Sequence, residues 1–592
     1  MRSVAFLIRF AILVAAGSGI EAAVGDPLYI DQGPDWTTAA RTDFYTRDQG
    51  SRLVSLAWLQ ALKGRDGQPF LRDGLARYGF LPNPGNTDNL PIGFHTTGPS
   101  GFRIVGITCS ACHTRQLEVD GKSYRIDGGP AFADFDAFLS DLDKAVGDVI
   151  SSDASFAPFA AAVLQSAAPA AGDVAGLRRR VDAWYRRFHA FVAGTLPPVG
   201  WGLGRLDAVG IIFNRLSGLD VGPPPDLLIP ENMKIADAPV RFPFLWNSPL
   251  QNMTDWAGFV KNGNYIYALS RNAGQALAFA NFEPRNSIGP FFNYANSINF
   301  NGLSKLEERL KQMGPPKWPR EWPINSALAT DGEKIYEREC DGCHGIKPAH
   351  SLFGRTWDTP VKNVGTDTRQ FDELGWKVKT GALKGAGVPF IANRLKEEDY
   401  AVHMMFSAVA GSILENLLFP GSVSPSGDGF GTSLTPDGQT SPLASSAIPL
   451  SAPQAPLDPA KESNAADSVQ SSRQTDSLTI ESGTIFARTL KRGEYEARVL
   501  QGIWAVAPYL HNGSVSTLAE LLTPSAQRRS HFNLGAKYDI ENVGVVATQD
   551  GPTRSVTDCN DLNSGNSRCG HEYGTSLSEP EKKALLEYLK TL

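Results

Sequence analysis

Cys340-Asp341-Gly342-Cys343-His344 is the stretch that decides the fold, and Cys109-Ser110-Ala111-Cys112-His113 repeats its pattern earlier in the chain. Two cysteines separated by two residues and followed at once by a histidine are typical of covalent haem c attachment, with the histidine as proximal iron ligand. A thioredoxin-like redox pair needs no such histidine, and a zinc site needs two further ligands at close spacing. Neither copy has these ligands nearby. The sequence therefore predicts two covalently attached haem c groups.

The first residues predict export. Met1-Arg2-Ser3 precedes an apolar run from Val4 to Ala16, and small residues follow before Val24. This order is typical of a secretory signal peptide, which we place at residues 1–23. The run carries Arg9 and is too short to span a bilayer comfortably, so we expect no stable membrane insertion. Because bacterial c-type cytochromes are assembled outside the cytoplasm, we expect a periplasmic or secreted protein of a Gram-negative-type bacterium.

Composition excludes one class of partner. The 592 residues are 42% hydrophobic and 20% charged, and they carry a net charge of −6 with no basic tract. Nucleic-acid-binding proteins show a basic patch or stripe, so we expect no nucleic acid partner. A chain of this length has room for about two to four domains.

Two cysteines remain outside the haem motifs, Cys559 and Cys569. They enclose a turn-rich loop, and in an oxidising compartment this pattern indicates a disulfide. Two free thiols are the alternative.

The chain divides into two expected haem domains after the signal peptide. Residues 24–325 should form the N-terminal domain, with helices over 52–62, 132–149, 155–170 and 174–196 and a hairpin over 117–126. Residues 326–592 should form a cytochrome c domain, in which a helix over 330–340 runs into the second motif and crosses a last helix over 578–592. Residues 421–482 are rich in Ser, Pro, Gly and Ala, which predicts a disordered insertion. The expected fold class is mainly α, with two cytochrome c-like domains, long loops and little β structure.

Each haem needs a sixth iron ligand or an open face, and this choice separates electron transfer from catalysis. The candidates after the second motif are His350, His403, Met404, Met405, His511, His531 and His571. Met404 and Met405 lie in an apolar run that favours a core helix, and a lone histidine is more often structural. His571 lies just before the last helix, in a loop that the expected disulfide would hold rigid. Between His113 and the second domain the only further histidine is His189, on an expected helix, so elimination leaves the first haem with an open face.

Several further stretches resemble the bacterial di-haem cytochrome c peroxidase superfamily, and within it the rubber oxygenase branch. The resemblance covers nearly the whole mature chain outside 421–482. It is carried by the two haem motifs and by Thr114, Tyr124-Arg-Ile-Asp-Gly-Gly-Pro130, Leu245-Trp-Asn247, Asp255-Trp-Ala-Gly258, Gly502-Ile-Trp504, Ala507-Pro-Tyr-Leu-His-Asn-Gly-Ser514 and Gly570-His-Glu-Tyr-Gly574.

The resemblance implies roles for individual residues. The haem of His344 would take His571 as its distal ligand and pass electrons, and a second imidazole in place of a thioether would make it a more reducing donor. His511 would be a structural histidine of the haem pocket. The haem of His113 would react with dioxygen or hydrogen peroxide, and Trp256 would relay electrons between the haems. Gln275 stands where the peroxidases carry a distal acid, and an amide cannot shuttle protons, which favours dioxygen.

We therefore expect a haem-dependent oxidoreductase of peroxidase-like or rubber-oxygenase-like activity, with His113, Trp256 and Gln275 at its reactive site. Its partners would be dioxygen or hydrogen peroxide, a hydrophobic organic substrate and a small periplasmic electron donor or acceptor. A non-catalytic di-haem electron-transfer cytochrome c is the alternative. A third possibility is a haem-bearing domain of a larger assembly that docks through 421–482.

Overall fold

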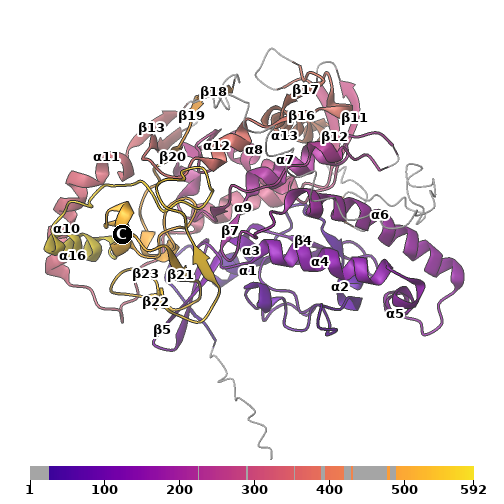
Figure 1. Cartoon of the computed structure of the whole chain (residues 1–592), viewed down its shortest axis with the longest axis horizontal. Coiled ribbons are helices and arrows are strands. Elements are labelled where there is room, and N and C mark those ends of the chain that lie inside the picture. The colour runs from indigo at the N-terminus through magenta and orange to yellow at the C-terminus, as the bar shows by residue number, and fades with distance from the viewer. Residues whose placement is uncertain are drawn as a thin grey trace, which may run out of the picture.

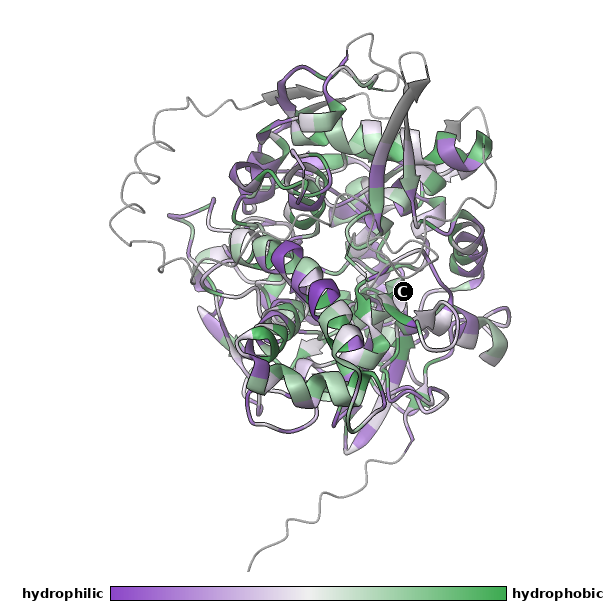
Figure 2. Cartoon of the chain, turned by 90° about the vertical axis from the view of Figure 1, so that its right-hand side faces the viewer, coloured by the Kyte–Doolittle hydropathy of each residue, from purple (hydrophilic) through white to green (hydrophobic). Residues whose placement is uncertain are grey.

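The computed structural model describes residues 26–224, 226–288, 291–351, 354–388, 394–418, 429–430, 477–480 and 488–592. The expected signal peptide lies outside these ranges. Figure 1 shows long helices in the N-terminal half and, at the other side of the molecule, the last helix lying beside the helix that opens the second haem motif. Figure 2 shows hydrophobic residues gathered where elements pack and hydrophilic residues on their outward faces.

Two small three-stranded sheets flank the first haem motif. One has the order β2-β4-β3 and the other β1-β6-β5, with β1 parallel to β6. The hairpin of β5 and β6 turns at Asp120 and Gly121, whose φ angles are 49° and 74°, values that suit an Asp-Gly turn. It confirms the hairpin predicted over 117–126. The strands are β1 (Leu28–Tyr29), β2 (Val54–Ser55), β3 (Phe94–Thr97), β4 (Ile104–Ile107), β5 (Thr114–Val119) and β6 (Lys122–Asp127).

Three long helices follow the first motif and confirm those predicted over 132–149, 155–170 and 174–196. They are α4 (Phe135–Ile150), α5 (Asp153–Val163) and α6 (Ala171–Thr195). The side chain of Asp134 accepts a hydrogen bond from the Ala137 N–H and so caps the start of α4. The helix predicted over 52–62 is shorter, because Val54 pairs with β4 and only α2 (Leu56–Ala61) is helical.

Short helices and paired strands fill the chain between α6 and the second motif. The pairs are β7 with β8, β9 with β10 and β11 with β12, all antiparallel. The elements not yet given are α1 (Thr38–Thr46), β7 (Arg205–Leu206), α7 (Ala208–Gly218), β8 (Val240–Arg241), β9 (Met253–Thr254), β10 (Val260–Lys261), α8 (Tyr265–Ala276), β11 (Phe282–Ile288), β12 (Phe291–Asn296) and α9 (Phe300–Gln312).

The second motif lies between two helices that cross closely. α10 (Ser326–Glu339) starts earlier than predicted, because the Asn325 side chain caps it, and it runs into α11 (Asp341–His344). α16 (Glu579–Leu589) begins with the predicted capping box of Ser578 and Glu581. A Cβ atom on Gly332 of α10 would lie 2.0 Å from the Ala584 carbonyl of α16, so only glycine permits this approach. The predicted crossing of first and last helix is confirmed (Figure 1).

Short strands make the fold less helical than expected. Helices make up 38% and strands 17% of the described residues, so the fold is mixed and the prediction of a mainly α fold is confirmed only in part. Most of these strands have two to four residues, too few for an alternating pattern to register in the sequence. The later elements are β13 (Pro348–Ser351), β14 (Gly354–Trp357), β15 (Val361–Asn363), α12 (Arg369–Leu374), β16 (Lys377–Lys379), β17 (Glu398–Tyr400), α13 (Ala401–Leu418), β18 (Ser477–Ile480), β19 (Arg488–Lys491), β20 (Glu494–Glu496), α15 (Leu518–Leu521), β21 (His531–Asn533), β22 (Tyr538–Asp539), β23 (Gly544–Val545) and β24 (Thr553–Ser555).

α13 is a core helix that joins the two expected domains. Among the described helices it is the one long and apolar enough to cross a membrane, but 61% of it is buried inside the protein. Met404 is fully buried and Met405 is 7% exposed, in the same core as α4 and α6. The core thus crosses the expected boundary between residues 325 and 326.

Most of the segment predicted as a disordered insertion, 421–482, lies outside the described residues. Two of its described residues are packed. Phe430 is fully buried against Phe188 and Phe191, and its N–H donates to the Arg52 carbonyl. Residues 477–480 pair with β19. The prediction of disorder is therefore wrong at these positions, because Phe430 packs into the core and residues 477–480 pair as a strand.

A pair of buried carboxyl groups lies between α7 and α12. Asp207 caps α7 and accepts from the Gly210 and Ala238 N–H groups. Glu373 is 1% exposed, and neither of its carboxyl oxygens has a hydrogen-bond donor among the described residues. Burial, followed by the charge of Asp207, raises the pKa of Glu373 well above its usual range. Glu373 therefore holds its proton in the folded protein.

We predict that Glu373→Gln stabilises the protein at neutral and alkaline pH. Since the pKa of Glu373 is raised on folding, its contribution to stability is complete below about pH 4 and is lost as the pH rises, at about 1.4 kcal/mol per pH unit. The amide keeps a donor and has no charge to lose, so the variant should gain about 1 to 2 kcal/mol at pH 7. Urea denaturation at pH 5 and pH 8 measures this. The exposed Glu397, paired with Lys384, provides the control Glu397→Gln. Equal pH dependence in wild type and Glu373→Gln would contradict the prediction.

Candidate haem-binding site

The first motif is held by the chain that follows its hairpin. Cys109–Cys112 form the short helix α3, and His113 follows it. The Gly128 N–H donates to the His113 carbonyl at 2.8 Å, and the Ala131 N–H donates to the Cys112 carbonyl at 3.0 Å. The imidazole Nδ1 of His113 lies 2.8 Å from the Pro243 carbonyl oxygen. A donor bond from Nδ1 leaves Nε2 unprotonated and able to bind iron.

The second motif repeats this arrangement with different supports. The Tyr336 hydroxyl of α10 donates to the His344 carbonyl at 3.1 Å. The imidazole Nδ1 of His344 lies 2.7 Å from the Arg498 carbonyl oxygen, so Nε2 is again the nitrogen left for a metal. The two histidines are thus oriented by backbone carbonyls that are far from them in the sequence.

Burial sets the protonation of the site. It lowers the pKa of His113 to about 4 and lowers that of His344, so both imidazoles are neutral at neutral pH, as ligation requires. Burial also raises the pKa of Cys109 and Cys112, and it raises that of Cys340 to about 11. All four motif cysteines are unpaired. Burial thus keeps Cys109, Cys112 and Cys340 as neutral thiols, and all four cysteines are available to form thioether bonds.

His571 faces the proximal histidine of the second motif. The ring centroids of His344 and His571 are 6.2 Å apart, with 42° between the ring planes. Two metal–nitrogen bonds of about 2 Å each, with about 1 Å from each nitrogen to its ring centre, add up to about 6 Å. The distance therefore suits two imidazoles on opposite sides of one iron. Burial lowers the pKa of His571 to about 4, and its Nδ1 has no partner among the described residues.

The loop that carries His571 is fixed at several points. The structure pairs Cys559 with Cys569, whose Cα atoms are 5.4 Å apart. The His571 N–H donates to the Val364 carbonyl at 2.8 Å, and its φ angle of 53° is held in the left-handed region. The Arg528 guanidinium donates to the carbonyls of Gly570 and His571. An axial ligand needs this kind of support.

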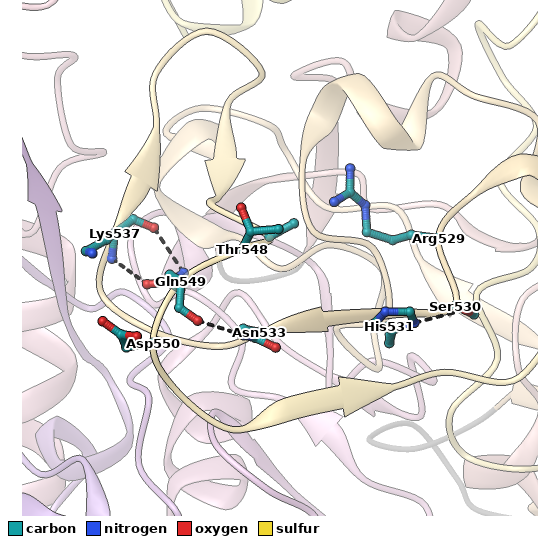
Figure 3. A pocket seen from close by; sticks show the side chains of 9 residues that line it. Arg529, Ser530, His531, Asn533, Lys537, Thr548, Gln549 and Asp550 are labelled. Atoms are coloured by element: carbon teal, nitrogen blue, oxygen red, sulfur yellow. Dashed lines mark hydrogen bonds between the residues drawn. The ribbon is translucent and has the colours of Figure 1, made fainter.

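The other sixth-ligand candidates are engaged elsewhere. His511 is buried and stacks on Tyr495 with ring centroids 3.8 Å apart, while burial lowers its pKa to about 3. His403 lies 2.8 Å from the Asp399 carboxylate. His531 is exposed and lines a surface cavity of about 740 Å³ with Arg529, Lys537 and Gln549 (Figure 3). The side chain of His350 lies outside the described residues.

Trp256 is bonded to both chain segments whose carbonyls accept from the proximal histidines. Its indole N–H donates to the Arg241 carbonyl at 3.0 Å, and its own carbonyl accepts from the Glu496 N–H at 2.7 Å. The Arg241 guanidinium lies 4.8 Å from its ring centroid. Its φ angle of 23° is rare for a residue with a side chain, and such backbone strain is found at functional sites.

Gln275 is brought to this junction by α8. Its amide nitrogen lies 3.3 Å from an oxygen of the Asp255 carboxylate, next to Trp256. Burial raises the pKa of Asp255. An acid group thus lies within hydrogen-bond distance of Gln275, where the sequence suggested only an amide.

Sequence analysis missed three residues of this region. Asp255 was quoted only as part of a motif, and Arg498 was not singled out. His95, before the first motif, is 6% exposed and bonds the Asp48 carboxylate at 2.8 Å. His189 bonds Asp143 at 2.9 Å. Both histidines have a carboxylate partner that occupies one ring nitrogen.

The residues present fit haem c. Each motif offers two thiols and a neutral imidazole with a fixed Nδ1. Arg241 donates only to carbonyls, those of Leu510 and Val506, and burial lowers its pKa to about 9. A buried cation favours an anionic group nearby, and haem c brings two propionates.

Comparisons with known proteins agree with this chemistry. A family model described as "RoxA-like, cytochrome c-like" matches residues 493–533, and one described as "Cytochrome C oxidase, cbb3-type, subunit III" matches residues 327–402. Two proteins of Sinorhizobium fredii are similar. "Uncharacterized protein y4iJ" is 28% identical over 622 residues, which cover 94% of this chain and 92% of that protein. "Uncharacterized protein y4iM" is 34% identical over 118 residues, which cover 16% of this chain and 27% of that protein.

These matches do not include the di-haem cytochrome c peroxidase superfamily, so membership of that superfamily stays a prediction. Cytochrome c domains hold covalent haem c and serve haem-based electron transfer or oxidoreductase activity. Two regions of the chain are thus similar to cytochrome c family models, and one of these models is RoxA-like.

Proposed function

We propose that the protein is an exported di-haem oxidoreductase, in which the haem of His113 reacts with dioxygen or hydrogen peroxide and the haem of His344 supplies electrons. The observation that carries this proposal is the difference between the two proximal histidines. His344 has a second imidazole 6.2 Å away, at the distance of a shared iron. His113 has a phenyl ring, that of Phe242, as its aromatic neighbour at 6.0 Å.

The pairing of His344 with His571 supports a six-coordinate electron-transfer haem. Two strong ligands leave no place for a small molecule, and the rigid loop keeps His571 in position. Two imidazoles also favour a lower reduction potential than one imidazole and one thioether.

The surroundings of His113 support an open haem. The other histidines before residue 326 are His95 and His189, and each is bonded to an aspartate. The methionines Met404 and Met405 are buried in the core on α13. An aspartate thus takes one ring nitrogen of each histidine and both methionines pack in the core, which favours an open distal face.

Two co-substrates follow from two different observations. Gln275 is an amide, which favours dioxygen and a hydrophobic organic substrate such as a polyisoprenoid. Asp255 is a partly buried acid with a raised pKa next to the exposed Gln275, which favours proton delivery during cleavage of hydrogen peroxide. Reduction of hydrogen peroxide consumes two electrons, which a small periplasmic electron carrier would supply, whereas cleavage of a double bond by dioxygen has no net demand for electrons.

We predict two attached haems per mature chain. Mass spectrometry of the exported protein should show the mass of two haem c groups, and the double variants Cys109→Ala/Cys112→Ala and Cys340→Ala/Cys343→Ala should each retain one. The Cys559→Ala/Cys569→Ala protein, which lacks only the disulfide, is the control and should retain both. One haem or none in the wild type would refute the proposal.

We predict that His571→Ala opens the second haem. EPR of the ferric wild type should show one high-spin and one low-spin haem, and ferrous protein should bind one carbon monoxide. His571→Ala should show two high-spin haems and bind two, because the removed imidazole vacates a coordination position. His511→Ala is the matched histidine control and should keep the wild-type pattern. A wild type that binds no carbon monoxide would favour a non-catalytic electron-transfer cytochrome.

We predict that turnover assays distinguish hydrogen peroxide from dioxygen as the co-substrate. If hydrogen peroxide is used, Asp255→Asn should lower its turnover with reduced cytochrome c about 100-fold, because a general acid contributes about 10² to 10⁴ to such rates. If dioxygen is used, oxygen uptake with polyisoprene should be seen in the wild type and change little in Asp255→Asn. Carbon monoxide binding by the variant serves as the control for an intact haem. No turnover in either assay would remove both activities.

A further inference from the structure

Each of the two proximal histidines bonds a backbone carbonyl, and a short chain of contacts connects these two carbonyls. The His113 imidazole bonds the Pro243 carbonyl at 2.8 Å, and the His344 imidazole bonds the Arg498 carbonyl at 2.7 Å. Pro243 is followed directly by Phe244 in the chain. One further side chain joins these two supports directly.

That side chain is Arg498 itself. Its Nη2 donates to the Phe244 carbonyl at 2.8 Å, across 254 residues of sequence. Arg498 therefore holds His344 through its backbone carbonyl and reaches the support of His113 through its guanidinium. The charge of this guanidinium also contributes to the lowered pKa of His113, which indicates that it lies near that ring.

The guanidinium has little freedom to move. Arg498 is 5% exposed, and its Nη1 donates to the Glu496 carboxylate, also buried, at 2.7 Å. Its plane lies against the Phe244 ring at 4.4 Å, and Phe244 stacks on Trp246 at 4.9 Å. A guanidinium that donates to a carboxylate and to a carbonyl at the same time is fixed in one orientation. A lysine ammonium cannot reproduce this geometry.

We propose that Arg498 is the positioning residue that couples the two haems electronically, through a continuous path from His344 to His113. The path has three hydrogen bonds, from His344 to the Arg498 carbonyl, from the Arg498 guanidinium to the Phe244 carbonyl and from His113 to the Pro243 carbonyl. This inference rests on the proposed function, because it needs two haems. In the step, one electron would leave the iron held by His344, taking it from ferrous to ferric, and would reach the iron held by His113, taking it from ferric to ferrous, and no bond or proton would change partner.

The route through Trp256 is longer. From Pro243 it must follow the backbone back to the Arg241 carbonyl, cross to the indole N–H, leave through the Trp256 carbonyl and then run from Glu496 to Arg498. The Arg498 route crosses only the peptide of Phe244 and one side chain. Electronic coupling falls with each added bond, so the shorter route should carry most of the transfer.

Two substitutions distinguish the effect of the hydrogen-bonded path from the effect of the positive charge of Arg498. Arg498→Lys keeps the positive charge, but its single ammonium should pair with Glu496 and lose the Phe244 bond. Arg498→Gln removes both the charge and the bond. Neither touches the backbone carbonyl that supports His344. Arg554 is 4% exposed and also donates to backbone carbonyls, so Arg554→Lys is the matched control for loss of a buried guanidinium.

The measurement is the loss of ferrous absorbance of the bis-histidine haem, as its electron moves to the other haem, after a flash-generated reductant has delivered one electron to the ferric protein. We expect transfer to slow by about tenfold or more in both Arg498 variants, equivalent to about 1.4 kcal/mol of activation free energy, with two haems attached and unchanged EPR signals. Arg554→Lys should transfer at the wild-type rate. A wild-type rate in either Arg498 variant would overturn the proposal.

The remaining outcomes are also decisive. Loss of a haem from both Arg498 variants, with both haems kept in Arg554→Lys, would assign Arg498 a structural role and overturn the proposal. A wild-type protein with fewer than two haems, or without carbon monoxide binding, would refute the proposed function before any variant is made.

Discussion

The hydrogen bond from each proximal imidazole to a backbone carbonyl is the constraint on which the rest of the structure depends. It fixes which nitrogen faces the haem pocket, while burial keeps the imidazole neutral, so that the side chain is prepared for iron before iron arrives. Both carbonyls lie far along the chain from their histidines, at Pro243 and Arg498. The long loops of this fold contain few regular elements. Their role is to place these two carbonyls next to the motifs.

The same constraint explains why the two motifs can differ in function while their attachment chemistry is equal. What differs is the opposite side of each imidazole. A disulfide-closed loop places His571 across from His344, whereas the other two histidines before residue 326, His95 and His189, are bonded to aspartates. An iron with two fixed imidazoles passes electrons, and an iron with one can bind a small molecule. The difference in function that we propose for the two haems thus follows from one loop before the last helix.

Much of the site could be predicted from the sequence, because its signals are local. The two motifs, the capping box at Ser578, the Asp-Gly hairpin and the setting of His571 each occupy a short stretch. The strand content was missed, since strands of two or three residues leave no alternating pattern. Arg498 and Asp255 were missed for a different reason. Their partners, Phe244 and Gln275, are brought to them only by the folded chain, over 254 and 20 residues.

The central claim is that one iron is open and the other is closed by two imidazoles. Near-infrared magnetic circular dichroism during a cyanide titration of the ferric protein tests it most directly, because the charge-transfer band of a low-spin haem identifies its axial ligands. The account predicts that one cyanide binds for every two haems, and that the band of the bis-histidine haem stays unchanged throughout. Uptake of no cyanide, or of two, or loss of the bis-histidine band on binding, would contradict it.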